Sequence, residues 1–256
     1  METKDIVSMS ISLLAFILSL AATTISLIRS KYEKQRAIRK EITDTLGKIV
    51  ATAIDNAKLF HEIAEKDPRY FESVSSILGQ QNAFLLQQAT YLTDQVPELV
   101  TAVEYNTIAA ATANAGDLIA AEKYYRKAID VSPNDYYRSL AIRSYANYLF
   151  PQRRFEEARE YFRKAISLLT GGDNLVRYTN GLTYQMWGWN EANIGGSPKR
   201  AEELFESALN EFKGIDIEAV RRNALNGLQG ARSSPSSPNP TLSPAAPNVA
   251  VAEPNR

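Results

Sequence analysis

Three segments of the chain repeat one pattern of small and aromatic residues, and this repetition most constrains the fold. A small residue is followed four positions later by an aromatic and three positions after that by a second small residue. The copies are Ala121, Tyr125 and Ala128; Ala158, Phe162 and Ala165; and Ala201, Phe205 and Ala208. Residues three and four apart share one face of a helix, so each copy predicts a helix. Alanine lets a neighbouring helix approach closely, and the ring fills the space between units.

A matching first helix precedes each of these segments. Each first helix carries bulky residues and a small residue on one face: Tyr105, Ile108 and Ala109; Ile142, Tyr145 and Ala146; Tyr184, Trp187 and Gly188. The predicted turns lie at 116–117, 152–154 and 195–198, and Pro133 closes the first unit. At the third turn, Ser197 as N-cap and Pro198 as first helical residue predict a helix start. The pattern therefore predicts three helical hairpins.

These units resemble tetratricopeptide repeats. The family pattern has a bulky residue, a small residue and a Tyr in the first helix, then Ala, aromatic, Ala and Pro through the second, over about 34 residues. The first unit, 102–135, matches best. The key Ala recurs later than the family predicts, at 121, 158 and 201, so 132–138 and 170–178 carry insertions, and 170–172 replace a closing Pro. The resemblance covers 98–213 and implies an all-α solenoid, with an ordinary helical bundle as the alternative.

The family's packing positions map onto this chain residue by residue. They are Ala109, Ala121, Tyr125, Ala128 and Pro133 in the first unit, Ala146, Ala158, Phe162 and Ala165 in the second, and Gly188, Ala201, Phe205 and Ala208 in the third. A helix over 217–229, with arginines on one side and apolar residues on the other, is expected to cap the last hairpin and complete a repeat domain over 98–230. The tail, 231–256, holds six Pro and five Ser without an aromatic, so we expect it to be disordered. Its Pro-x-x-Pro spacings leave a docking motif as the alternative.

The N-terminal segment, 1–28, is predicted to be a transmembrane anchor. Residues 6–28 are 23 consecutive residues without a charge. As a helix they extend roughly 35 Å, enough to cross a hydrocarbon core of about 30 Å. A cleaved signal peptide is the alternative, but its basic n-region and small-residue cleavage site are poorly matched here.

A basic flank follows the predicted anchor. Residues 29–40 contain Arg29, Lys31, Lys34, Arg36, Arg39 and Lys40 against Glu33 alone, although the whole chain has 29 basic and 29 acidic residues. The positive-inside rule predicts a single-pass protein of the cell (inner) membrane with its C-terminal domain in the cytoplasm. Recognition of anionic lipid is the alternative role for these cations.

A helical connector is expected over 29–97. One amphipathic helix is predicted over 31–66, with apolar residues at Ile42, Leu46, Ile49 and later turns, and a second over 69–94. Because Asp67 and Pro68 separate them, an antiparallel hairpin is predicted. A parallel coiled-coil dimer is the alternative for the first helix, but alanines and Gly47 make its seam thin.

The resemblance to the family implies a concave groove, lined by the first helices, that binds an extended peptide or a partner helix. Carrying the groove positions over selects Asn106, Arg143, Asn147, Phe150, Gln185 and Trp189 as candidates. Amide side chains offer both a donor and an acceptor to a peptide backbone, and Arg143 suits a carboxylate. For Phe150 and Trp189, a place in the core between repeats is the alternative.

The composition argues against an enzyme. Without Cys, and with one His, the chain has no thiol chemistry and no Cys or paired His metal site, and it shows no phosphate loop or nucleophile elbow. No catalytic residue, metal or cofactor is expected. The slightly acidic repeat region disfavours nucleic acid. We expect a membrane-anchored interaction module with a protein or peptide ligand, in contact with the bilayer and able to form a homo-oligomer. The alternatives are an envelope protein whose repeats lie outside the cytoplasm and assist secretion or assembly, and a structural, self-associating membrane protein.

Overall fold

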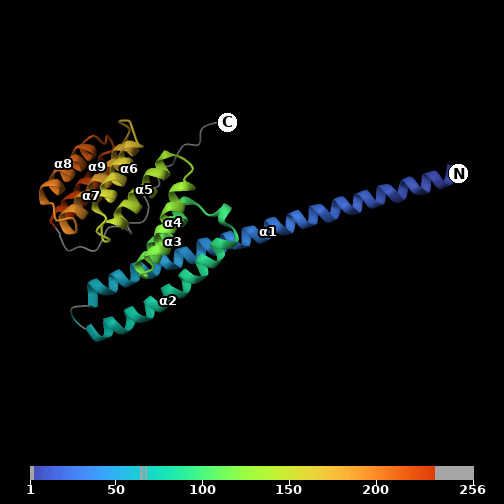
Figure 1. Cartoon of the computed structure of the whole chain (residues 1–256), viewed down its shortest axis with the longest axis horizontal. Helices are drawn as coiled ribbons and strands as arrows, with labels where there is room; N and C mark the ends of the chain where they lie inside the picture. Colours follow the sequence, from blue (N-terminus) through green and yellow to red (C-terminus); the bar gives the residue numbers. More distant parts are fainter. Residues whose placement is uncertain (1–2, 64–65, 67, 234–256) are drawn as a thin grey trace.

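The structure is a computed structural model in which residues 3–63, 66 and 68–233 are described, with side chains from residue 19 onward apart from 60, 61, 63 and 68. Over these residues every regular element is helical. The chain divides into a long N-terminal hairpin and a stack of shorter helices beside it (Figure 1). This confirms the predicted all-α class.

The hairpin consists of α1 (Thr3–Ile63) and α2 (Pro68–Gln95). The predicted anchor and the predicted first connector helix form one continuous helix, because no Pro or Gly pair interrupts the sequence between them. α1 ends at Ile63, three residues before the predicted end at Lys66. α2 returns antiparallel along the second half of α1, while the first half projects alone (Figure 1). The predicted hairpin is therefore confirmed.

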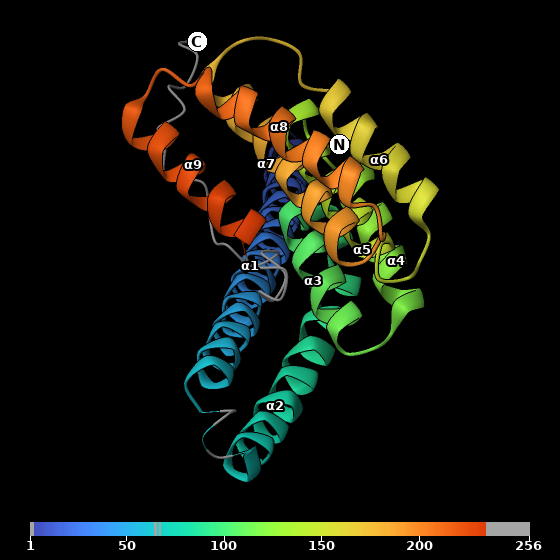
Figure 2. The same cartoon turned by 90° about the vertical axis from the view of Figure 1, so that its left-hand side faces the viewer.

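The repeat array follows a short 3-10 turn, η1 (Pro97–Leu99). Three hairpins pair α3 (Ala102–Asn114) with α4 (Leu118–Asp130), α5 (Asp135–Leu149) with α6 (Phe155–Ser167), and α7 (Asn174–Asn193) with α8 (Pro198–Lys213). The first helices also contact one another, α3 with α5 and α5 with α7, and so form one layer of the stack. Figure 2 shows this stack above the α1/α2 hairpin.

Short polar side chains begin several of these helices. Thr101 and Glu104 form a reciprocal capping box at the start of α3. Asp117, Asn134 and Asp173 accept hydrogen bonds from backbone N–H groups in the first turns of α4, α5 and α7. Each of these caps satisfies a donor that the helix itself leaves unpaired. The local sequence thus sets where the hairpins start.

The small and aromatic repeat positions form the core of the array. Of the thirteen predicted packing residues, twelve are buried; the alanines Ala109, Ala121, Ala128, Ala146, Ala158, Ala165 and Ala208 have no exposed surface. Pro133 is the exception, because it lies exposed in the turn between α4 and α5, where it stops the helix without packing. The close approach that alanine permits is therefore used in all three hairpins.

A final helix, α9 (Glu218–Ser233), covers the last hairpin. Ala224 and Leu228 are buried against α7 and α8, and Val220 and Leu225 pack beside them. This confirms the predicted cap, which continues four residues beyond the expected end. The rest of the predicted disordered tail, 234–256, lies outside the described residues.

Among the side chains that the structure describes, no helix combines the length and the hydropathy needed to cross a bilayer. The first thirteen residues of the predicted span, 6–18, lie outside those side chains.

Candidate functional site

The layer formed by α3, α5 and α7 places three of the groove candidates at equivalent positions. Asn106, Arg143 and Gln185 each follow the first bulky core residue of their helix, and each is partly buried. Because α3 contacts α5 and α5 contacts α7, these three side chains follow one another along the same layer. The structure therefore brings together the row that the repeat register predicted.

Arg143 is the one charged residue in this row. Its Nε and Nη1 atoms are buried and have no hydrogen-bond partner among the described residues. Burial lowers the pKa of the guanidinium, because loss of solvent disfavours its charge, while the neighbouring Tyr136 and Tyr178 oppose that effect. An arginine nevertheless remains protonated at any physiological pH. Arg143 thus presents a desolvated cation that no carboxylate of the described chain neutralises.

Asn106 also has a buried polar atom without a hydrogen-bond partner, but its side chain is uncharged. Its Oδ1 atom is buried without a hydrogen-bond donor among the described residues. Gln185 differs, because its Nε2 donates to the carbonyl of Gly227 in α9 over 3.3 Å. The cap helix therefore occupies the end of the row, and the atoms without a hydrogen-bond partner lie on α3 and α5.

Asn147 joins α5 to α7 and does not face a groove. It is 4% exposed, and its Oδ1 accepts a 2.8 Å hydrogen bond from Nδ2 of Asn190, which is 1% exposed. A buried amide with a satisfied carbonyl stabilises the contact between repeats. In this structure Asn147 therefore belongs to the contact between repeats, and its role in binding a ligand stays a prediction.

Phe150 is a core residue. Its side chain has no exposed surface, and its ring lies 5.7 Å from that of Phe155 and 6.0 Å from that of Phe162. Hence the core alternative applies to Phe150, and it cannot line the groove. Trp189 is partly buried and packs against the hydrophobic cluster formed by α8, α9 and the loop between them.

The six cations of the basic flank do not share one environment. Arg39 donates to the carboxylate of Glu104 and so ties α1 to the start of α3, and Arg29 pairs with Glu33 at 2.9 Å. The others, Lys31, Lys34, Arg36 and Lys40, are exposed. Hence Arg39 has a structural role that the charge pattern alone did not indicate.

Ion pairs on the outer side of the array hold hairpins together. Glu122 of α4 accepts from Arg154 over 2.7 Å, from Arg126 over 2.8 Å and from the Tyr145 hydroxyl over 2.7 Å. The hydrogen bond from Arg154 is the main reason that the pKa of Glu122 falls to about 2, against a smaller opposing effect of burial. With every partner present, this cluster stabilises the array and offers no open position for chemistry.

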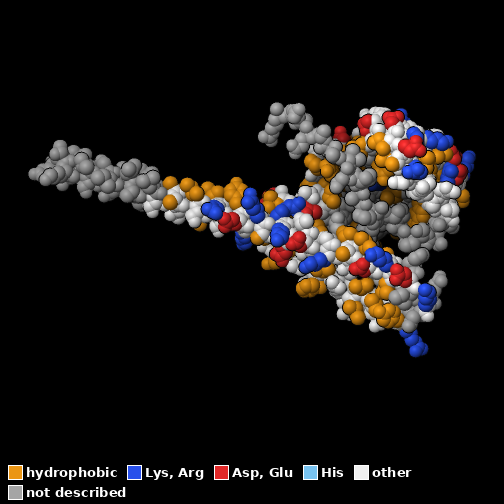
Figure 3. Space-filling model, turned by 180° about the vertical axis from the view of Figure 1, so that it is seen from behind, with side chains coloured by type: hydrophobic (Ala, Val, Ile, Leu, Met, Phe, Trp, Pro, Cys, Tyr) orange, Lys and Arg blue, Asp and Glu red, His pale blue; other side chains and the backbone are white. Residues whose placement is uncertain are grey.

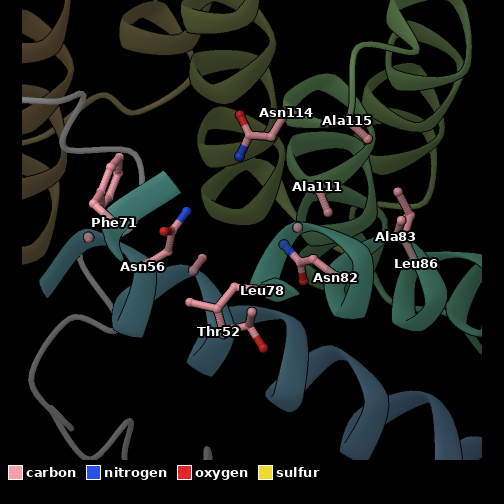
Figure 4. Close-up of a pocket in the computed structure, with 13 residues that line it drawn as sticks. Thr52, Asn56, Phe71, Leu78, Asn82, Ala83, Leu86, Ala111, Asn114 and Ala115 are labelled. Carbon is pink, nitrogen blue, oxygen red and sulfur yellow. The ribbon is translucent and has the colours of Figure 1, made fainter. Parts of the chain in front are cut away.

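A pocket that the sequence did not predict lies between the connector and the first repeat. Its volume is about 630 Å³, and its walls come from α1, α2 and α3 (Figure 4). The lining is largely apolar, with Phe71, Leu78 and Leu86 among its larger side chains, and three amides, Asn56, Asn82 and Asn114, face it. Oδ1 of Asn82 is buried without a hydrogen-bond partner in the described chain. The sequence could not predict this pocket, because the three asparagines belong to separate helices and only the packing of the α1/α2 hairpin against α3 brings them together.

No group of three or more acidic, His or Cys side chains suited to a metal ion occurs among the described residues. The prediction that no metal is held stays a prediction.

The comparison with protein families supports a tetratricopeptide repeat protein. The family model described as tetratricopeptide repeat matches residues 105–135 and 144–168, which cover most of the first and second hairpins. No curated protein and no solved structure matches the chain. The family of the repeats is therefore supported by the two hairpins whose lengths depart least from the family pattern.

Proposed function

We propose that this protein is a membrane-anchored interaction module whose inner layer binds an extended, acidic peptide segment of a protein partner. The observation that carries the proposal is Arg143, whose buried Nε and Nη1 atoms have no partner in the described chain. A desolvated guanidinium without an anion is costly, and a carboxylate from a ligand offsets that cost by pairing with its charge.

Asn106 extends the proposed site along α3. Its Oδ1 is an acceptor without a donor, and a backbone N–H of an extended ligand supplies that donor. The family comparison matches the range that contains Asn106, and Arg143 directly precedes the second matched range, which begins at residue 144. A ligand that carries one acidic residue and an extended backbone therefore matches both polar groups.

Anchoring is supported by the exposed surface of α1. Leu20, Ile25, Leu27 and Ile28 are 51–67% exposed on a part of the helix that no other element covers. Tyr32, 63% exposed, lies within the basic flank, between Lys31 and Glu33. Figure 3 shows Lys and Arg side chains on α1 after this apolar stretch. An apolar helix surface that ends in an aromatic and a basic collar is typical of a segment leaving a bilayer. The positive-inside rule, applied to these cations, supports an orientation with the repeat array on the cytoplasmic side.

The peptide proposal is tested with the full chain in lipid nanodiscs and a random library of twelve-residue peptides. Wild-type protein is expected to enrich peptides with Asp or Glu at one position. Arg143→Gln removes the charge and is expected to abolish that enrichment, whereas Arg163→Gln, an exposed cation on α6, leaves it unchanged. Equal enrichment by both variants contradicts the proposal.

Anchoring is tested separately by alkaline carbonate extraction of membranes that contain the full chain. The protein is expected to remain in the membrane pellet, and a variant without residues 1–28 is expected in the supernatant. A phosphatase reporter fused after Arg232 is expected to be inactive. Release of the full chain by carbonate contradicts the anchor, and an active phosphatase contradicts the orientation.

A further inference from the structure

Large apolar side chains form a straight row on the outer surface of α2. Ile77, Phe84 and Tyr91 are 60%, 67% and 68% exposed, and they are spaced seven residues apart. Tyr70, 52% exposed, continues the same spacing at the start of the helix. Seven residues are nearly two helical turns, so these side chains lie on one face with a drift of about 20° per step.

The row is separate from the core of the hairpin. Leu85, Ala89 and Leu92 are the buried residues that α2 packs against its neighbours, and each lies on a different face from the row. Hydrophobic side chains are visible over the hairpin below the repeat array (Figure 3). Packing within one chain therefore does not require large apolar residues at these positions.

The surroundings of the row disfavour a charged partner surface. Residues 73–93 contain no Asp, Glu, Lys or Arg, so the row is flanked by side chains such as Ser73, Gln80 and Gln87, and Asp94 is the first charge beyond its C-terminal end. An uncharged apolar row fits another uncharged apolar row, whereas a charged surface would lose its solvation on contact without gaining an ion pair.

A bilayer is also a poor occupant for this face. The 2.8 Å hydrogen bond between Gln88 and Glu41 and the 3.2 Å bond between Ser75 and Asn56 hold α2 antiparallel to α1. When α1 crosses a membrane, α2 runs along the membrane normal and returns toward the membrane with its C-terminal end. The row then stands perpendicular to the lipid surface and does not lie flat on it. The row also lacks the cations that helices lying on a membrane present on their polar face.

We infer that the row of Ile77, Phe84 and Tyr91 pairs with the same row of a second copy of this chain, in a parallel and in-register α2/α2 contact. A repeat of seven is the period at which two helices keep one face in contact along their length. The parallel direction rests on the proposed anchoring, because two chains inserted the same way into one membrane are related by a two-fold axis along its normal. Identical residues then face each other across that axis.

The row supplies part of the area that a stable interface needs. Phe84 and Tyr91 are aromatic side chains, which cover about 150–250 Å² each when buried. At about two-thirds exposure, and together with the smaller Ile77, they contribute roughly 350 Å² per chain. A standard interface needs about 800 Å² per partner. The row thus supplies nearly half of that area, and the flanking Ser and Gln side chains adjoin it on the same helix.

The chain contains no cysteine, so single cysteines report the contact without background. Two cysteine variants lie on the same face of α2 as the row. Ser73→Cys is near the N-terminal end of α2, and Gln81→Cys is near its middle, between Ile77 and Phe84. Lys48→Cys is the matched control, exposed on α1 at about the same level of the hairpin as Gln81. Membranes containing the full chain are oxidised with copper phenanthroline and examined for disulfide-linked dimers.

Both Ser73→Cys and Gln81→Cys are expected to form dimers, with at least a tenfold excess over Lys48→Cys. Phe84→Glu in either background is expected to abolish the dimer, whereas Ile119→Glu, at an 87% exposed site on α4, leaves it unchanged. Circular dichroism checks that both variants remain helical.

The outcomes separate the contact from the anchor. Dimers at Gln81→Cys without dimers at Ser73→Cys overturn the parallel arrangement, since residues near the middle also meet in an antiparallel pair. The absence of dimers at both positions, or crosslinks to a different protein, overturns the contact itself. Dimers at both positions in a chain that carbonate releases support the contact and contradict only the anchor.

Discussion

Arg159 of α6 donates two hydrogen bonds to the buried carboxylate of Glu191 in α7, from Nε to Oε1 over 2.7 Å and from Nη2 to Oε2 over 2.8 Å. The Glu191 side chain has no exposed surface, and Nε1 of Trp187 donates to the same carboxylate over 3.0 Å. Because the two residues belong to successive hairpins, this pair holds the second repeat against the third.

Removing Arg159 is expected to destabilise the array strongly. In Arg159→Ala the Glu191 carboxylate stays buried and keeps only the more distant Arg200, at 3.7 Å, as an ion-pair partner. Breaking a buried pair typically costs about 3–5 kcal/mol, and the remaining cation places the expected loss at the lower end of that range. Glu156→Ala removes a partner of Arg159 that is 84% exposed, and a loss of less than about 1 kcal/mol is expected. Urea unfolding followed by circular dichroism measures both. Equal losses would show that the buried pair has no special role.

Acid is expected to weaken the contact between the first and second hairpins. The hydrogen bond from Arg154 to Glu122 holds the pKa of that carboxyl at about 2, below the ordinary value of 4.5. A lowered folded-state pKa contributes stability that is present above about 4.5 and is lost as the pH falls toward 2. The contribution is on the order of 2 kcal/mol.

The variant Glu122→Gln isolates this contribution, because it lacks the titrating group and keeps a similar shape. Its unfolding free energy is expected to fall less steeply between pH 4.5 and pH 2 than that of the wild type, with thermal melts at half-unit intervals as the measurement. Parallel curves would rule out Glu122 as the source.

Glycine at position 181 is expected to be required by the ring of Phe212. A Cβ added to Gly181 would lie 2.3 Å from that ring, which is fully buried in the hydrophobic cluster formed by α8, α9 and the loop between them and has no room to move away. Gly181→Ala is therefore expected to cost about 1–3 kcal/mol through overpacking. Gly227→Ala, whose Cβ meets nothing within 4 Å on α9, is expected to gain about 0.5–1 kcal/mol. A melting temperature that rises in both variants would contradict the first expectation.

Arg39 is expected to fix the connector to the array, although it belongs to the predicted basic flank. Its guanidinium donates to Glu104, and Thr43 Oγ1 lies 3.4 Å from the same carboxylate. Arg39→Gln is expected to speed amide hydrogen exchange in the first turn of α3, whereas Lys40→Gln, which is exposed, is not. Both variants keep five of the six cations and are expected to keep the proposed membrane orientation. Unchanged exchange in Arg39→Gln would show that the ion pair does not hold α3.

The helical elements were predictable because their signals are local. The 3.6-residue period of the apolar residues indicates which face each helix buries, and Ser197 followed by Pro198 indicates where α8 begins. The structure contains the third hairpin, although the family model does not match it. Its first helix, α7, is 20 residues long and follows an insertion, so this hairpin departs from the length of the family pattern.

The groove was predicted less well, because it depends on contacts between helices. Phe150 and Asn147 lie at groove positions of the family pattern, but Phe150 turns into the ring cluster and Asn147 meets Asn190 on the next repeat. The pocket lined by Asn56, Asn82 and Asn114 had no sequence signal for the same reason.

By itself the sequence determined the three hairpins, their small and aromatic contact residues and the uncharged segment ahead of a basic flank, since each depends on residues a few positions apart. Only the tertiary structure decided which polar side chains are already satisfied. Gln185 bonds to the cap helix, Arg39 bonds to α3, and the Nε and Nη1 atoms of Arg143 have no partner in the described chain. The physical reason is that hydrogen bonds between helices depend on how neighbouring hairpins are rotated and spaced, and the insertions between these repeats make that geometry specific to this chain.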